Sequence, residues 1–206
     1  MLYTNTVEEN TLELLRNISS HSSFSNFYLA GGTALALQIG HRMSIDLDFF
    51  SAHGFDEKQL VSILEKDYNA SIISQYKNTV LTNIEGVKVD IISHQYEQLS
   101  KNSTIDGIRM ASKDDIAAMK LNAVVNRGSK KVLVDVFFLL RDYSMNELIT
   151  FHNRKYPNQN ELLVLKSLTY FADVDLEPEP LMIEKCRWDE IKKSVKEQVN
   201  SYIKET

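Results

Sequence analysis

The chain has few of the features that mark secreted or membrane proteins. It contains a single cysteine, Cys186, which excludes an internal disulfide and a cysteine-rich metal site. Its longest strongly apolar stretch, residues 132–140, is far too short to cross a membrane. The first residues show no basic region followed by an apolar run, so we expect no secretion signal and a cytoplasmic location.

Positive charge is also scarce. The chain carries 23 Lys and Arg against 28 Asp and Glu, and its net charge of −5 argues against a surface that binds nucleic acid throughout, while leaving room for a local basic patch. A Walker A loop, Gly-x-Ser-x-Gly and His-Glu-x-x-His are all missing, which removes support for a P-loop ATPase, a serine hydrolase and a zinc protease.

Two glycines, a helix and two aspartates are the most informative features that are present. Gly31-Gly32-Thr33 follows a short apolar strand, and its backbone N–H groups can approach a polyphosphate because no Cβ stands in the way. Asp46 and Asp48 follow in an apolar strand and point to the same face by alternation. Paired carboxylates near a core are costly unless cations occupy them, and Mg²⁺ or Mn²⁺ are the expected occupants. The pattern predicts a nucleotidyltransferase site that binds NTP.

Each part has a simpler interpretation by itself. A glycine pair is usually a tight turn, and an Asp-x-Asp pair is usually a solvated strand end. Arg42 could contact phosphate or form a structural salt bridge, and Ser44 could hydrogen-bond a carboxylate or a metal-bound water. The order strand, turn, helix and strand makes the combination more specific than its parts.

Asp90 is the expected third acid. It is the only acid in the apolar strand that follows a Glu85-Gly86 turn, and a two-metal phosphoryl-transfer site needs a third carboxylate beside the first two. We expect Asp46, Asp48 and Asp90 to hold metal, with Asp90 also drawing a proton from the attacking hydroxyl. The alternative is an edge-strand aspartate that faces water.

Positive charges for a triphosphate are expected in the second half of the chain. Lys120 and Arg127 are seven residues apart on a predicted helix and so project from nearly the same face, with Lys130 and Lys131 following. Asp135 is a lone acid in a strongly apolar helix, so it needs a partner, and Lys120 or Arg127 is the natural candidate. A solvated helix face is the alternative for these cations.

Periodicity and turn signals predict a mixed α/β domain over residues 1–112 and a helical domain over 113–206. The first helix is expected from Thr6, which would cap it, to Ile18. The other expected elements are strands at 27–30, 45–50, 70–75, 79–84 and 87–92, and helices at 33–39, 57–66, 114–127, 131–141, 145–156, 159–171 and 188–203.

These motifs resemble those of the AbiEii/AbiGii-type nucleotidyltransferase toxins, a branch of the DNA polymerase β-like nucleotidyltransferase superfamily. Gly31 to Leu35 and Gly40 to Phe50 resemble the family's N-terminal signature, and Asp115 to Ala123 resembles its lysine motif. The resemblance implies an α+β fold, with a nucleotidyltransferase-like mixed sheet and flanking helices followed by a helical C-terminal domain. One position departs from the pattern: the family's last motif usually reads Lys-Asp-x-x-Asp, and here Val132 replaces the first acid.

By the same resemblance, the chain would transfer NMP from NTP with Mg²⁺ as the toxin of a toxin–antitoxin or phage-defence system. Gly32 and Thr33 would hold phosphates, Asp46 and Asp48 metal, Lys120 the triphosphate, and Asp135 a supporting or catalytic role. The expected partners are NTP, an RNA acceptor such as tRNA, and a cognate antitoxin, which need not contact the chain directly. The alternatives are a catalytically weak NTP- or antitoxin-binding module, and a transferase acting on a protein or a small molecule.

Overall fold

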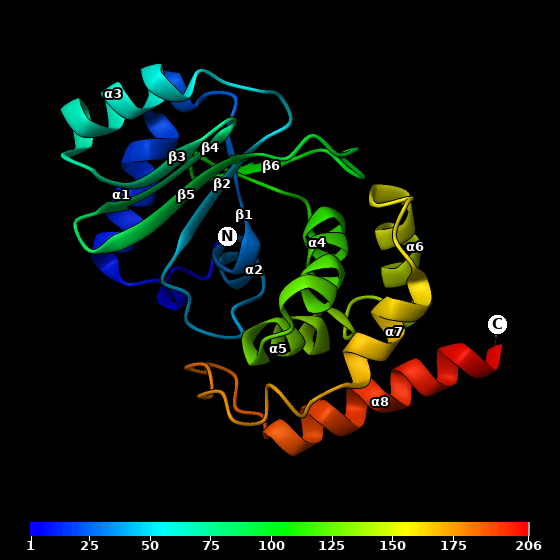
Figure 1. Cartoon of the computed structure of the whole chain (residues 1–206). Coiled ribbons are helices and arrows are strands. Elements are labelled where there is room, and N and C mark those ends of the chain that lie inside the picture. The colour runs from blue at the N-terminus through cyan, green and yellow to red at the C-terminus, as the bar shows by residue number, and fades with distance from the viewer. Residues whose placement is uncertain (206) are drawn as a thin grey trace. The chain divides into compact units, whose positions relative to one another are not determined.

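The structure, a computed structural model, describes residues 1–205 and divides them into two compact units (Figure 1). The first unit comprises Met1–Tyr96 and Lys101–Ala111. The second comprises Glu97–Ser100 and the described chain from Ser112 onward.

A seven-stranded mixed sheet forms the centre of the first unit. Its strand order is β3-β4-β5-β2-β1-β7-β6. β1 runs antiparallel to β2 and parallel to β7, and β2 runs parallel to β5. The strands are β1 (Tyr28–Ala30), β2 (Leu47–Ser51), β3 (Ser71–Tyr76), β4 (Thr79–Ile84), β5 (Val87–Ser93), β6 (Ser103–Ile105) and β7 (Ile108–Met110).

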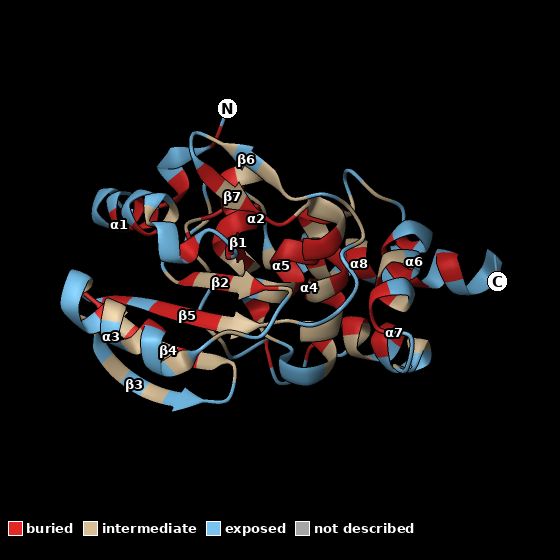
Figure 2. Ribbon diagram, turned by 90° about the horizontal axis from the view of Figure 1, so that it is seen from above, coloured by how far each residue is buried: buried red, intermediate tan, exposed pale blue. Residues whose placement is uncertain are grey.

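Alternation along the central strands separates a buried face from a second face that carries acids. Val87, Val89 and Ile91 are buried on β5, whereas Lys88 and Asp90 point to the other side. Three helices belong to this unit: α1 (Glu9–Ser20), α2 (Gly31–Ile39) and α3 (Glu57–Tyr68). Leu15 and Ile18 of α1 and Leu60 and Leu64 of α3 complete the core. Figure 2 shows β5 largely in the red of buried residues.

The second unit is helical. It contains α4 (Lys113–Arg127), α5 (Lys130–Leu139), α6 (Met145–Lys155), α7 (Glu161–Thr169) and α8 (Trp188–Glu205). Serine hydroxyls at positions 112, 129 and 144 accept backbone N–H groups at the N-termini of α4, α5 and α6. No helix in the described part of the chain is long and apolar enough to cross a membrane. A mixed sheet with flanking helices followed by a helical half confirms the expected fold class.

A buried carboxylate fastens the short segment 97–100 to the helical unit. Asp115 lies 2.7 Å from the Lys155 ammonium and accepts hydrogen bonds from the Ser112 hydroxyl and from the backbone N–H groups of Leu99 and Ser100. Burial opposes ionisation of Asp115, but these hydrogen bonds outweigh it and hold the pKa of its carboxyl below the ordinary value.

Three expectations about local structure were wrong. Thr6 does not cap α1, because its hydroxyl donates to the Tyr3 carbonyl and the helix begins only at Glu9. β2 begins only at Leu47, so Ile45, which is 53% exposed, and Asp46 lie before the strand, and of the two aspartates only Asp48 is on it. β6 and β7 were missed, although Asp106-Gly107 between them is a strong hairpin signal.

Candidate functional site

The carboxylate of Asp48 occupies the space beside Gly31. β1 ends at Ala30, which pairs with Asp48 on β2, and α2 begins at the next residue. A Cβ at Gly31 would lie 2.2 Å from Asp48 Oδ2, and Gly31 has φ of +68°. Only glycine meets both conditions, because other residues would clash and would be strained at that φ.

Gly32 makes room for two further predicted residues. A Cβ there would lie 2.6 Å from Arg42 Nη2 and 3.3 Å from Ser44 Oγ. Arg42 is 3% exposed, and its Nη1 donates to the Met43 carbonyl at 2.9 Å. The glycine pair therefore accommodates side chains of this chain. The N-cap residue, Ala30, gives α2 no side-chain cap, at a helix end where an anion is favoured.

Thr33 ties the start of α2 to the segment before β2. Its hydroxyl donates to the Asp46 carbonyl and lies 2.9 Å from the Ser44 hydroxyl. The Thr33 side chain is 1% exposed. Its hydroxyl is thus engaged within the protein, so any contact with phosphate at this position would have to come from the backbone.

Asp90 lies directly beside Asp48. The two residues are register partners on the parallel strands β2 and β5, so their side chains share one face of the sheet. β5 has strand neighbours on both sides, which rules out the edge-strand alternative for Asp90. Asp90 is 9% exposed, and its Oδ1 is buried without a hydrogen-bond partner. Such an orphaned carboxylate oxygen is the kind of atom that a cation satisfies.

Lys88 belongs to the same cluster as Asp46, Asp48 and Asp90, although it lies in none of the predicted motifs. Its ammonium lies 2.7 Å from Asp90 Oδ2. This hydrogen bond, with further attraction from Asp90, Asp46 and Asp48, raises the pKa of Lys88 against the effect of burial. The signal was present in the sequence, because Lys88 and Asp90 are two positions apart on a strand, a spacing that places both side chains on one face.

The three predicted metal ligands do not form a finished metal cage. Among residues 1–205, no group of three or more His, Cys, Asp or Glu side chains is placed to hold a metal ion. Their chemistry still fits Mg²⁺ or Mn²⁺, since both prefer carboxylate oxygens and one buried oxygen of Asp90 lacks a partner.

In the helical unit, Lys120 and Asp135 form a buried ion pair of 2.6 Å between α4 and α5. The expectation that Asp135 needs Lys120 or Arg127 as its partner is confirmed for Lys120. Arg127, in the last turn of α4, is exposed, whereas Lys120 is buried.

Lys130 binds to the loop that precedes α8 instead of facing an open site. Its ammonium donates to the carbonyls of Asp175 and Glu177 at 3.3 and 2.5 Å and lies 5.2 Å from the ring centroid of Trp188. Its backbone N–H donates to the Glu177 carboxylate. The suggestion that Lys130 binds a triphosphate therefore loses support. Lys131, the next residue, is exposed.

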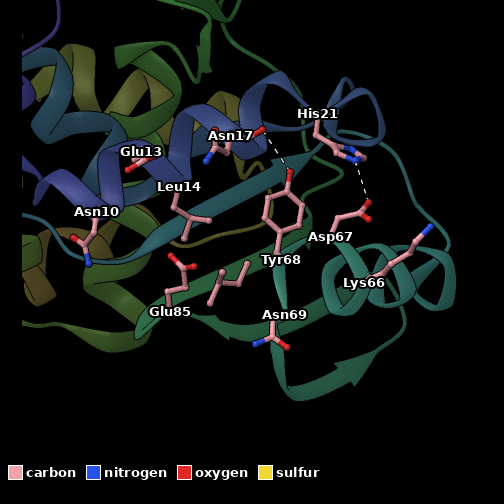
Figure 3. A pocket seen from close by; sticks show the side chains of 11 residues that line it. Asn10, Glu13, Leu14, Asn17, His21, Lys66, Asp67, Tyr68, Asn69 and Glu85 are labelled. Atoms are coloured by element: carbon pink, nitrogen blue, oxygen red, sulfur yellow. Dashed lines mark hydrogen bonds and ion pairs between the residues drawn. The ribbon is translucent and has the colours of Figure 1, made fainter.

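A separate polar pocket of about 690 Å³ lies on the opposite face of the sheet (Figure 3). Ile84 lines it and pairs with Val87, which points away from the face of Asp90. The Tyr68 hydroxyl donates to the Asn17 carbonyl across it, and His21 Nε2 lies 3.4 Å from Asp67 Oδ2 at one side. None of the residues predicted from the sequence to form the site lines this pocket.

Comparisons with known proteins point in one direction. The family described as "Nucleotidyl transferase AbiEii toxin, Type IV TA system" matches residues 13–204. An uncharacterized protein of Aquifex aeolicus (strain VF5) is 34% identical over 204 residues, which span 93% of this chain and 95% of that protein.

Two solved structures resemble the fold. JHP933 from Helicobacter pylori superposes with a TM-score of 0.58 at 19% identity, covering 97% of this chain and 94% of that one. MenT4, the nucleotidyltransferase toxin Rv2826c of Mycobacterium tuberculosis H37Rv, gives a TM-score of 0.55 at 12% identity, covering 93% and 84% of the two chains. At these identities the likeness is one of fold.

Proposed function

Because this chain belongs to the AbiEii nucleotidyltransferase toxin family, we propose that it is a metal-dependent enzyme that transfers NMP from NTP to a hydroxyl acceptor. One observation carries the proposal. The glycines at the start of α2 fold directly against Asp48, Arg42 and Ser44, and Asp48 is the register partner of Asp90. A helix N-terminus that favours phosphate thus lies beside the carboxylates that favour a cation.

Each group in the cluster has a proposed task. The backbone N–H groups of Gly31, Gly32 and Thr33 and the guanidinium of Arg42 bind and orient phosphate oxygens. Ser44 keeps Thr33 in place through the contact between their hydroxyls. Asp46, Asp48 and Asp90 hold Mg²⁺ or Mn²⁺, which when bound would neutralise charge on the triphosphate.

The reaction balances as an in-line displacement. The acceptor oxygen forms a bond to the α-phosphorus while the bond from that phosphorus to the α–β bridging oxygen breaks, and pyrophosphate leaves with the bonding electron pair. Asp90 takes the proton of the attacking hydroxyl, a task that a positioned carboxylate can perform. Positioning by α2 and Arg42 supplies the orientation that such a displacement requires.

The helical unit enters the proposal through its motif. Lys120 and Asp135 occupy the positions of the family's lysine motif and last motif, and we assign Lys120 and exposed Arg127 to the triphosphate, with Asp135 supporting Lys120. The proposed acceptor is an RNA such as tRNA, and the biological setting is a toxin–antitoxin or phage-defence system with a cognate antitoxin. The single cysteine, Cys186, agrees with a cytoplasmic location.

Labelled NTP tests the proposal directly. The purified protein is incubated with Mg²⁺, total cellular RNA and each of the common NTPs in turn, radiolabelled at the α-phosphate. Asp48→Asn removes one negative charge from the cluster with little change of shape and should abolish labelling. Asp106→Asn is the matched control, because Asp106 lies in the β6–β7 turn at φ of +52°, a conformation that asparagine tolerates.

The position of the label separates the alternatives. Label on a tRNA-sized band with wild type and Asp106→Asn, but not with Asp48→Asn, supports transfer to RNA. Label on protein or on a small molecule would keep the transferase and replace the acceptor. Saturable NTP binding without any pyrophosphate release would instead support a binding module and overturn the proposed enzyme.

A further inference from the structure

We propose that Lys88 is a built-in counter-cation of the carboxylate cluster, which it neutralises until a divalent cation binds and displaces it. This inference rests on the proposed function, since it concerns the same carboxylates. It adds a residue that belongs to none of the motifs by which the family is recognised here. It also gives a physical reason why the three acids form no finished metal cage.

The position of the Lys88 ammonium is the first argument. It lies 2.7 Å from Asp90 Oδ2, and the negative charges of Asp46 and Asp48 also act on it. Asp48 and Asp90 are adjacent across β2 and β5, so without a cation their like charges would repel on one face of the sheet. A positive charge held among the acids offsets that repulsion.

The second argument is the unfilled coordination of Asp90. Lys88 satisfies Oδ2, while Oδ1 stays buried without a hydrogen-bond partner. An ammonium is a point charge with three donors and serves this carboxylate through one oxygen only. A divalent cation, which carries twice the charge and accepts several oxygen ligands, is better matched to the whole cluster.

The third argument is that Lys88 can leave. Its side chain is 48% exposed, whereas those of Lys120 and Lys155 are 9% and 2% exposed in ion pairs of almost the same length. Withdrawing either buried ammonium would strand a charge in the interior, which is costly. Lys88 can instead swing its flexible stem toward water at the small cost of an exposed pair.

Competition between Lys88 and the metal has two measurable consequences. Removing the Lys88 charge should increase metal affinity, because binding no longer breaks an ion pair or meets a like charge. Removal should also destabilise the metal-free protein, because one positive charge that offsets the repulsion between the acids is then lost. Metal would restore that stability, since a ligand that binds only the folded state stabilises it.

The experiment compares Lys88→Met with wild type in the absence of nucleotide. Mn²⁺ binding is followed by the loss of the free-ion EPR signal, and thermal unfolding is measured with and without Mn²⁺. We expect Lys88→Met to bind Mn²⁺ about threefold to tenfold more tightly, as expected for loss of one partly exposed pair. Its metal-free Tm should fall by about 2–4 °C and recover when Mn²⁺ is added.

Three variants serve as controls. Lys77→Met removes the same charge from the exposed β3–β4 turn and should leave the Mn²⁺ affinity unchanged. Lys88→Arg keeps the positive charge and should bind Mn²⁺ close to the wild-type affinity. Lys88→Gln is a second neutral variant that should reproduce Lys88→Met and guards against a defect specific to methionine.

The outcomes distinguish this inference from the proposed function. Suppose that Asp48→Asn abolishes the Mn²⁺ binding of the wild type, while Lys88→Met and Lys88→Gln both bind Mn²⁺ with the wild-type affinity. This result would overturn the role of Lys88 and leave the metal site standing. Tight binding by Lys88→Arg equal to that of Lys88→Met would also overturn it, because the charge would then be irrelevant. No saturable Mn²⁺ binding by any variant would overturn both proposals.

Discussion

The ammonium of Lys120 lies 2.6 Å from the carboxylate of Asp135, and the two side chains are 9% and 0% exposed. This pair joins α4 to α5, and Leu121, Val124 and Val136 of the same two helices are buried as well. A buried pair is costly to form, but it is costlier to break on one side only, because the remaining charge is left without a partner.

We therefore expect Asp135→Ala to lower the free energy of unfolding by about 3–5 kcal/mol. The double variant Lys120→Met with Asp135→Leu should lose less, because it buries apolar groups of similar volume and leaves no unpaired charge. Urea denaturation of the three proteins measures the difference. Equal losses in the single and double variants would contradict the predicted coupling.

Gly31→Ala should damage the site more than any ordinary glycine substitution. The new Cβ would lie 2.2 Å from Asp48 Oδ2, and φ of +68° adds backbone strain. Displacement of Asp48 by about 1 Å would lower the transfer rate about a hundredfold. Transfer of labelled NMP at saturating NTP measures the effect.

Gly86→Ala is the matched control for that substitution. Gly86 also has positive φ, of +87°, but a Cβ there meets nothing within 4 Å. This variant should lose about 1 kcal/mol of stability from backbone strain and keep its transfer rate. A Gly31→Ala enzyme as active as Gly86→Ala would show that Asp48 does not depend on the space at Gly31.

Lys130→Met should lower stability without affecting NTP binding. The Lys130 ammonium donates to two carbonyls of the loop that precedes α8 and lies over Trp188. Losing these contacts should cost about 1–3 kcal/mol and make residues 173–187 more susceptible to limited proteolysis. Lys131→Met, at an exposed neighbouring position, should change neither property. A weakened NTP affinity in Lys130→Met alone would return Lys130 to the nucleotide site.

His152 should make the helical unit sensitive to mild acid. Burial lowers the pKa of His152 below the ordinary value, although Asn153, Gln159 and the charge of Glu161 act in the opposite direction. Folding therefore requires the neutral ring, and the stabilisation is fully present above the unfolded pKa of about 6.5. It is lost as pH falls below that value, until the folded pKa is reached.

His152→Gln removes this titration. Between about pH 7.5 and about pH 5.5, wild type should lose more unfolding free energy than His152→Gln does. Chemical denaturation at several pH values measures both slopes. Parallel slopes would mean that the folded protein accepts the proton at His152 without cost.

Much of the fold follows from local patterns. Alternating apolar residues predict β4 and β5, and the Glu85-Gly86 pair predicts the turn between them, where both residues have positive φ. β6 and β7 were not predicted, because each is three residues long and too short for an alternating pattern to be recognised. Their place in the sheet depends on the pairing of Leu29 with Met110, a long-range contact that no local pattern reveals.

The members of the candidate site were easier to predict than their relationships. Spacing alone singles out Gly31, Asp48 and Asp90, and the structure places Gly31 and Asp90 beside Asp48. The proposed role of Lys88 depends on strand register. Asp90 must lie opposite Asp48 before the ammonium of Lys88 can act on acids of both β2 and β5. The environment of Lys130 depends on the loop that follows α7, which lies far away in the sequence.

The shifted register between Ile72 and Ser74 also bears on how this protein behaves at high concentration. β3 is an edge strand with Ile73 and Tyr76 exposed, and such strands invite a second copy to pair with them. A bulge bends the edge and disrupts the row of unpaired backbone groups that a newcomer would need. We therefore expect the same small irregularity that interrupts the β3–β4 ladder to hinder pairing of a second copy with this edge.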